Sequence, residues 1–142
     1  MSQSEVLDRA ACLELMRTVG LGRVAWAADD GRVVVEPVNF VLDDEGVLFR
    51  TAEGDKLDAV RRGHAFSFET DEVEPALRVG WSVLVSGRAE VVSDADQRSS
   101  DPRLPSPWDR SAPKPYLVRI RAEQVSGRRL PLPSGGVSFI EQ

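Results

Sequence analysis

The sequence has very little of the chemistry that metal sites and disulfide frameworks require. Its 142 residues include one cysteine, Cys12, and one histidine, His64. A single cysteine cannot form an internal disulfide, and together the two residues offer too few soft ligands for a structural zinc site. We therefore expect no metal centre. Cys12 falls on the apolar stripe of a predicted helix, where a free cysteine behaves as a small buried hydrophobic residue.

Long apolar runs and an excess of positive charge are absent as well. No run approaches the roughly 18 apolar residues of a membrane span, and the acidic residues of "MSQSEVLDRAACLELM" do not fit the basic start of a signal peptide. We expect a cytoplasmic protein that is not bound to membrane. The net charge of -5 argues against nucleic acid as a partner, because such binding depends on positive surface.

What the sequence does contain is the pattern of one mainly β domain. The length suits a single domain over residues 1–142, with a core over about 8–130 and a mobile tail at 131–142. Turn sequences such as "DDGR" and "DDEG" separate β-branched and aromatic segments. The predicted strands are 22–28, 33–42, 47–51, 65–71, 81–94 and 115–127.

Two short helices accompany these strands. Asp8 is placed to cap a helix that runs to about Val19, and a second helix over 56–62 is expected to end at Gly63. Helices and strands do not alternate as they would in a Rossmann fold. We therefore predict a mainly β protein, a six-stranded antiparallel barrel that is closed or half-closed.

The stretch "FRTAEGDKLDAVRRG" is a candidate anion site. Arg50 can form paired hydrogen bonds to phosphate or carboxylate, Thr51 adds a hydroxyl, and Lys56 adds a point charge. Lys56 begins the second helix, where the macrodipole disfavours a cation unless an anion lies nearby. Asp55 is the expected cap of that helix. The alternative is that the cations are solvated and balanced by Glu53 and Asp55.

Two further segments favour an aromatic ligand. In "EPVNF", Pro37 marks a sheet edge, a bulge or a parting of the sheet, and Asn39 needs a polar partner, which is either a ligand or a local backbone group. In "GWSVLVSG", Trp81 and Ser82 open a long strand, although Trp81 could equally serve the core. Trp108, inside the proline-rich loop 94–115, packs either on the core or over a pocket.

These segments resemble a known family. "GRVAW", "EPVNF", "LFRTAEGDKLDAV", "FSFETDE", "GWSVLVSGRAEVV", "PW" and "YLVRIRAEQVSGRRL" occur in the same order as in the pyridoxamine 5'-phosphate oxidase-like, FMN-binding split-barrel proteins. The similarity is to the short actinobacterial type, which is related to nitroimidazole-resistance-like flavoproteins. It covers residues 8–130 and implies a six-stranded antiparallel split β-barrel of Greek-key type.

The resemblance also implies a homodimer with the cofactor at the subunit interface. The cofactor would be FMN, with deazaflavin or haem as alternatives. Its implied function is an FMN-dependent oxidoreductase that transfers hydride to or from an unidentified small molecule. The alternative is a non-catalytic flavin, deazaflavin or haem carrier or sensor. No residue is assigned as catalytic, and His64 is expected to be solvated at its helix end.

Site residues follow from the same resemblance, motif by motif. Three residues would lie along the isoalloxazine, namely Val38, Asn39 and Phe40. Four would hold the ribityl phosphate end, namely Arg50, Thr51, Lys56 and Leu57. Trp81 and Ser82 would line the ring or the interface, and Trp108 would reach the ring from the partner chain.

Overall fold

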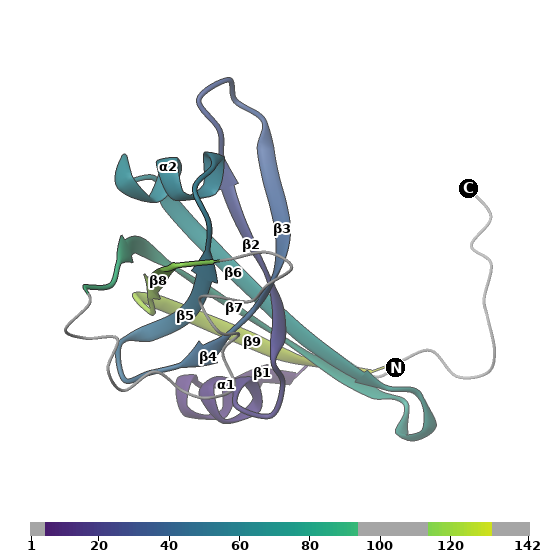
Figure 1. The fold of residues 1–142 in the computed structure, drawn as a ribbon. Helices are drawn as coiled ribbons and strands as arrows, with labels where there is room; N and C mark the ends of the chain where they lie inside the picture. The colour runs from purple at the N-terminus through teal and green to yellow at the C-terminus, as the bar shows by residue number, and fades with distance from the viewer. Residues whose placement is uncertain (1–4, 94–113, 132–142) are drawn as a thin grey trace, which may run out of the picture.

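A computed structural model of the chain describes residues 5–93 and 114–131, which form a curled antiparallel sheet with two helices (Figure 1). The elements in chain order are β1 (Glu5–Leu7), α1 (Arg9–Met16), β2 (Leu21–Ala27), β3 (Val33–Asn39), β4 (Val41–Leu42), β5 (Gly46–Thr51), α2 (Asp55–Arg61), β6 (Ala65–Glu74), the 3-10 turn η1 (Pro75–Leu77), β7 (Val79–Val91), β8 (Tyr116–Arg121) and β9 (Gln124–Pro131).

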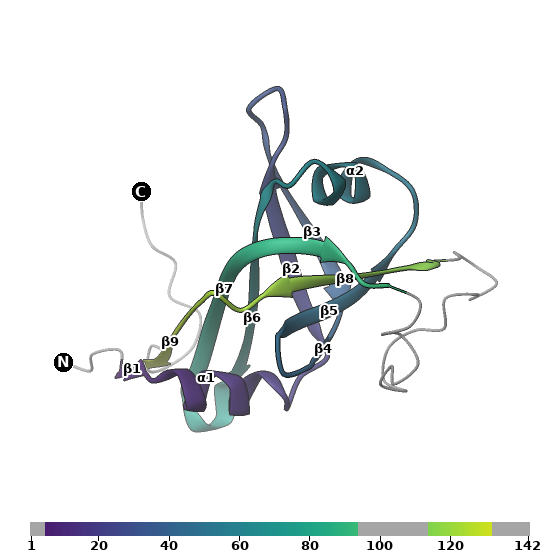
Figure 2. The same ribbon diagram turned by 90° about the vertical axis from the view of Figure 1, so that its left-hand side faces the viewer.

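The sheet runs in the order β3-β2-β6-β7-β8-β5-β4, and β9 lies between β7 and β1. Strand β7 joins the two halves, because its first part pairs with β6 and β9 and its last three residues pair with β8. Figure 2 shows how this long strand bends across the molecule. The predicted mainly β, antiparallel half-closed barrel is confirmed, with nine strands among the described residues in place of six.

The higher strand count has local causes. The predicted strand 33–42 divides at Phe40. The ladder between β3 and β2 ends at Asn39, and the N–H of Phe40 donates instead to the carbonyl of Gly20. The predicted strand 115–127 divides at a turn in which the N–H of Ala122 donates to the carbonyl of Glu45. Strand β1 has only three residues and depends on its pairing with β9, so the local sequence gives no indication of it.

Both predicted helices are present. The carboxylate of Asp8 accepts a hydrogen bond from the N–H of Ala11 at 2.8 Å, as expected of the cap of α1. The predicted cap of α2 is wrong: Gly54 occupies the cap position and Asp55 is the first helical residue. Gly63 follows α2 with a φ of 78°, a left-handed conformation that ends the helix as predicted.

The core lies inside the curl of the sheet and is closed by α1. Cys12 and Met16 of α1 are fully buried, which confirms the prediction for the cysteine. Strand β5 is buried along its whole length. Its first residue, Gly46, approaches β8 so closely that an added Cβ would lie 2.0 Å from the carbonyl oxygen of Ile120. Strand β5 therefore has a fixed position, and it carries Arg50 and Thr51.

Candidate anion-binding site

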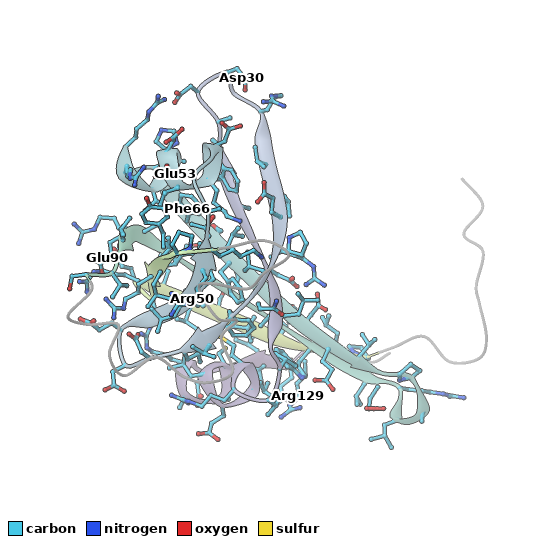
Figure 3. All side chains as sticks on the ribbon, viewed as in Figure 1. Asp30, Arg50, Glu53, Phe66, Glu90 and Arg129 are labelled. Carbon is cyan, nitrogen blue, oxygen red and sulfur yellow. The ribbon has the colours of Figure 1, made fainter. Side chains whose placement is uncertain are left out.

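Arg50 is buried in the body of the barrel and has no charge partner among the described residues. It lies opposite Leu117 of β8, and only 7% of its surface is exposed. Its Nε and Nη1 atoms are buried and have no hydrogen-bond partner within residues 5–93 and 114–131. Burial alone lowers the pKa of this guanidinium. Figure 3 shows Arg50 well inside the molecule, whereas Asp30 lies at its periphery. Buried polar groups are nearly always paired, so these N–H groups are an open donor site.

Lys56 faces the same region from the first turn of α2. Its side chain is 15% exposed, and its Nζ lies 2.9 Å from Oε2 of Glu36 on β3 and 5.7 Å from the centre of the Phe49 ring. Glu53 is paired with Arg61 instead. The alternative of a solvated lysine balanced by Glu53 and Asp55 is therefore wrong. Lys56 is held in place by a single carboxylate that is itself half-exposed.

A small pocket of about 30 Å³ joins these two side chains. It is lined by Pro37, Val38, Asn39, Arg50, Lys56 and Lys114. Every charged side chain in this described lining is a cation. Two of them are largely withdrawn from water, where an electrostatic attraction is stronger than at an open surface. The pocket is therefore suited to a small anionic group such as a phosphate or a carboxylate.

The predicted site residues around this pocket take different orientations. Phe40 and Leu57 are core residues, with the Phe40 ring edge-on to Phe68 at 4.6 Å between ring centres. Thr51 is buried, and its hydroxyl donates to the carbonyl of Ala52 at 3.2 Å. Asn39 is exposed, and its amide has no hydrogen-bond partner among the described residues. The alternative in which Asn39 satisfies a local backbone group is therefore wrong.

Trp81 and Ser82 lie at the other end of β7. They pair with Arg129 and Arg128 of β9, whereas β7 reaches β8, the neighbour of Arg50, only from Ala89 onward. At about 3.3 Å per residue, this separation is roughly 25 Å along the strand. One chain therefore does not bring these two residues to the pocket. Trp108 lies outside the described residues, as does most of the loop 94–115.

A larger groove, of about 450 Å³, lies between the β2–β3 hairpin and α2. Its lining comprises Trp26, Ala28, Asp29, Asp30, Arg32, Val34, Glu36, Asp55, Asp58, Ala59, Arg62 and His64. His64 is not the freely solvated residue that we expected. Its Nδ1 lies 3.1 Å from the carbonyl oxygen of Ala27, and its Nε2 lies 3.3 Å from Oδ1 of Asp29. Within residues 5–93 and 114–131, no cluster of histidine, cysteine or acidic residues suits a metal ion.

Comparison with known proteins identifies the family and the fold. A model of the family described as pyridoxamine 5'-phosphate oxidase matches residues 8–129. The chain belongs to the pyridoxamine 5'-phosphate oxidase-like family. An uncharacterized protein of Mycobacterium tuberculosis is 34% identical over 87% of this chain and 84% of its own length.

Two solved structures extend the comparison to three dimensions. A crystal structure named as a putative pyridoxamine 5'-phosphate oxidase from Corynebacterium glutamicum is 31% identical, with a TM-score of 0.72 over 94% of this chain and 99% of its own. A protein named as an FAD-binding protein from Mycobacterium smegmatis is also 31% identical, with a TM-score of 0.68 over 90% and 99% of the two chains.

In this member of the pyridoxamine 5'-phosphate oxidase-like family, sequence reasoning missed two residues of the site. Glu36 lies within "EPVNF", and the alternation of Val34, Glu36 and Val38 could have placed it on the inner face of β3. Lys114 precedes β8 and lines the pocket. No local pattern marks it, because it reaches the pocket only through the path of the chain.

Proposed function

We propose that this protein binds a flavin nucleotide, FMN, and that Arg50 and Lys56 hold its phosphate. The observation that carries the proposal is the buried guanidinium of Arg50, whose Nε and Nη1 lack a partner. A phosphate would accept hydrogen bonds from both atoms and neutralise the charge that burial leaves unbalanced. The name of the M. smegmatis structure, an FAD-binding protein, supports a flavin, since FAD consists of FMN joined to AMP through its ribityl phosphate.

The size of the pocket supports a second part of the proposal, a homodimer with the flavin at its interface. A volume of about 30 Å³ is far too small for a three-ring system, so the pocket can contact only one end of such a ligand. The flavin ring would then lie outside the pocket, along Val38 and Asn39 and the backbone at Phe40. A second subunit would cover it there. Val33 and Val35, which are 72% and 59% exposed on the edge strand β3, offer apolar surface for that contact.

In such a dimer the distant residues would act across the interface. Trp81 and Ser82 cannot reach the pocket of their own chain, so we assign them, with Trp108, to the site of the partner. Thr51 and Leu57 would then support the phosphate end through their backbone, because their side chains are buried. The oligomeric state measured by light scattering tests this arrangement. Val35→Glu should yield monomers that lose the flavin, whereas Val91→Glu, at an exposed valine beside β8, should not.

When bound, the flavin would supply hydride transfer, and the protein would supply position and electrostatics. The cations around the phosphate fix the cofactor, and Asn39 offers a free amide to the ring edge. We therefore propose an oxidoreductase that acts on a small molecule. The described lining of the pocket contains no histidine, cysteine or carboxylate. This observation favours a second candidate, a flavin carrier or sensor that performs no proton transfer of its own.

The binding experiment compares FMN, FAD and riboflavin with wild-type protein and with two variants. Lys56→Ala should weaken FMN and FAD about tenfold or more while leaving riboflavin nearly unchanged, because only the first two carry phosphate. Arg88→Ala removes an arginine that is 80% exposed and paired with Glu123, and should change none of the three. Equal losses for FMN and riboflavin in Lys56→Ala would contradict the phosphate assignment.

A separate experiment distinguishes the enzyme from the carrier. The flavin absorbance of the loaded protein is followed while a nicotinamide or chemical donor is added, and then while candidate acceptors are added. Reduction followed by reoxidation that depends on the acceptor supports the oxidoreductase. A flavin that binds tightly but whose oxidation by every acceptor is no faster than that of free FMN supports the carrier.

A further inference from the structure

The closed end of the β2–β3 hairpin extends beyond the part of the sheet that supports its base. Strand β2 pairs with β6 only from Arg23 to Ala25, whereas it pairs with β3 as far as Ala27. The end of the hairpin is therefore a two-stranded ribbon, and Figures 1 and 2 show its turn projecting past α2. A two-stranded ribbon is only marginally stable by itself. Contacts with neighbouring elements therefore determine where this end of the hairpin lies.

His64 supplies two of these contacts. It follows Gly63 at the end of α2, and its backbone N–H donates to the carbonyl of Ala59 in that helix at 3.0 Å. Both ring nitrogens face the hairpin: Nδ1 lies 3.1 Å from the carbonyl oxygen of Ala27, and Nε2 lies 3.3 Å from Oδ1 of Asp29. The imidazole of His64 therefore connects the end of α2 to the end of the hairpin.

The two contacts of the ring cannot both be hydrogen bonds when the ring is neutral. A carbonyl and an ionised carboxylate accept hydrogen bonds and do not donate them. Neutral imidazole has one N–H, so its other nitrogen would present a lone pair to an oxygen atom. The imidazolium ion has two N–H groups and can donate to both. Histidine changes between these forms in the range of about pH 5 to 8. The pair of contacts is therefore complete only when His64 is protonated.

The charged groups around His64 come from the hairpin and from α2. Together they form the charged lining of the groove of about 450 Å³ between these elements, and they are Asp29, Asp30, Arg32, Glu36, Asp55, Asp58 and Arg62. Asp30 is paired with Arg32, Glu36 with Lys56, and Asp29 with Arg62. On the side of β7, Arg88 lies opposite Ala65 but is paired with Glu123. Acids outnumber arginines in this lining, so a protonated ring meets no excess of positive charge.

We propose that His64 is a proton-operated latch: the protonated ring holds the β2–β3 hairpin against α2, and loss of the proton loosens the hairpin. Two other contacts do not depend on this proton. Asp29 also forms an ion pair with Arg62, and Trp26 stacks on Phe66 with 5.3 Å between ring centres. The hairpin therefore loosens at higher pH and does not detach.

The latch joins the same two elements that form walls of the phosphate pocket. Strand β3 supplies Pro37, Val38 and Asn39 to that pocket, and α2 supplies Lys56. A closed latch fixes these walls relative to one another, and a preformed site binds its ligand more tightly than one that must be ordered first. The latch should therefore strengthen FMN binding. Only this consequence rests on the proposed flavin; the latch itself does not.

The first experiment examines the full chain without flavin by NMR. His64 is the only histidine in the sequence, so its ring signals are unambiguous. At about pH 5.5 two ring N–H protons should be visible, because hydrogen bonds slow their exchange with water. The amide of Ala28, which donates to the carbonyl of Arg32 at 2.8 Å, reports on the hairpin. Its hydrogen-exchange protection factor should fall about two- to fivefold between about pH 5.5 and pH 8, as expected for the loss of one partly exposed contact.

His64→Asn is the variant without a titrating ring. Its amide can still donate toward the carbonyl of Ala27, but it takes up no proton in this range, so the protection of Ala28 should be the same at both pH values. Asp44→Asn, at an exposed acid in the β4–β5 turn, should retain the pH dependence of wild type. FMN should bind wild type about two- to fivefold more tightly than His64→Asn at about pH 5.5 and equally at pH 8. Titration of the FMN phosphate is common to both proteins and cancels in this ratio.

The outcomes separate the latch from the flavin. Protection of Ala28 that does not change with pH in wild type, or that changes equally in His64→Asn, would overturn the latch whether or not FMN binds. A latch that titrates together with an FMN affinity ratio of one at both pH values would refute its effect on the pocket. A protein that binds no FMN contradicts the proposed function alone, because the first experiment has already decided the latch.

Discussion

Replacing Arg50 by methionine should make the protein more stable without its ligand and less stable with it. The perturbation exchanges a buried guanidinium for an apolar chain of similar length. In wild type, Nε and Nη1 are buried without partners, and burial also lowers the pKa of the group. Methionine needs no such partners and tolerates irregular space in a core. The substitution should therefore raise the free energy of unfolding of the ligand-free protein and lower that of the ligand-bound protein.

The magnitude follows from the cost of unsatisfied donors. A buried polar group without a partner costs about 1–3 kcal/mol. The third nitrogen, Nη2, is not completely buried, so it adds less to this cost than Nε and Nη1 do. We expect Arg50→Met to stabilise the ligand-free protein by about 1–3 kcal/mol. For a chain of this size, each kcal/mol raises Tm by about 3–5 °C. Wild type at 100 times its Kd for FMN should gain about 2.7 kcal/mol, and the variant far less.

The assay is thermal unfolding of flavin-free protein with and without FMN. Arg119→Met is the matched control: Arg119 is similarly buried, but its guanidinium lies 2.6 Å from Asp43 and is also paired with Glu45 and Glu90. Removal of this arginine should destabilise both states, because it leaves Asp43 without a cation among the described residues and leaves Glu45 and Glu90 with Arg121 alone. A ligand-free Arg50→Met that melts below wild type, or one that FMN stabilises as strongly as wild type, would refute the reasoning.

Three further results are expected. Glu36→Gln should tighten FMN binding a few-fold relative to riboflavin, because it frees Lys56 from a competing carboxylate. Burial alone would raise the pKa of Asp43, but hydrogen bonds from Arg119 and two backbone N–H groups hold it below its ordinary value. Its contribution to stability is thus full above about pH 4 and lost below it, and urea midpoints of Arg119→Met should fall less steeply with acid than those of wild type. Gly46→Ala should cost about 3 kcal/mol in urea unfolding, because its Cβ meets a backbone carbonyl of β8.

The elements that the sequence predicted well are those with local causes. The cap at Asp8, the stop at Gly63 and the alternation of β2 each depend on near neighbours, and each is present. Strand β1 and the division of β8 from β9 depend on pairing partners far away in the chain, so local patterns could not show them. The predicted cap of α2 was wrong by one residue: Asp55 was expected at the cap position, but Gly54 occupies it and Asp55 begins the helix.

The candidate site shows the same division. The pairing of Arg50 with Lys56 in one pocket was predictable from their spacing and from the family resemblance. The identity of the Lys56 partner was not, since Glu36 lies on another strand. Sequence also could not show that Arg50 is buried without a partner, and that single fact is what separates a binding site from a pair of surface cations.

The Lys56–Glu36 ion pair connects the two cavities. Lys56 faces the cationic pocket and Glu36 the acidic groove, so each is partly neutralised by the other. An anion that binds Lys56 would weaken its hold on Glu36 and leave the groove more negative. The proposed flavin phosphate and Glu36 therefore compete for the same ammonium group, so the affinity for phosphate depends on the difference between the two contacts. Glu36→Gln removes the competing carboxylate, which is the physical reason that it should tighten FMN binding.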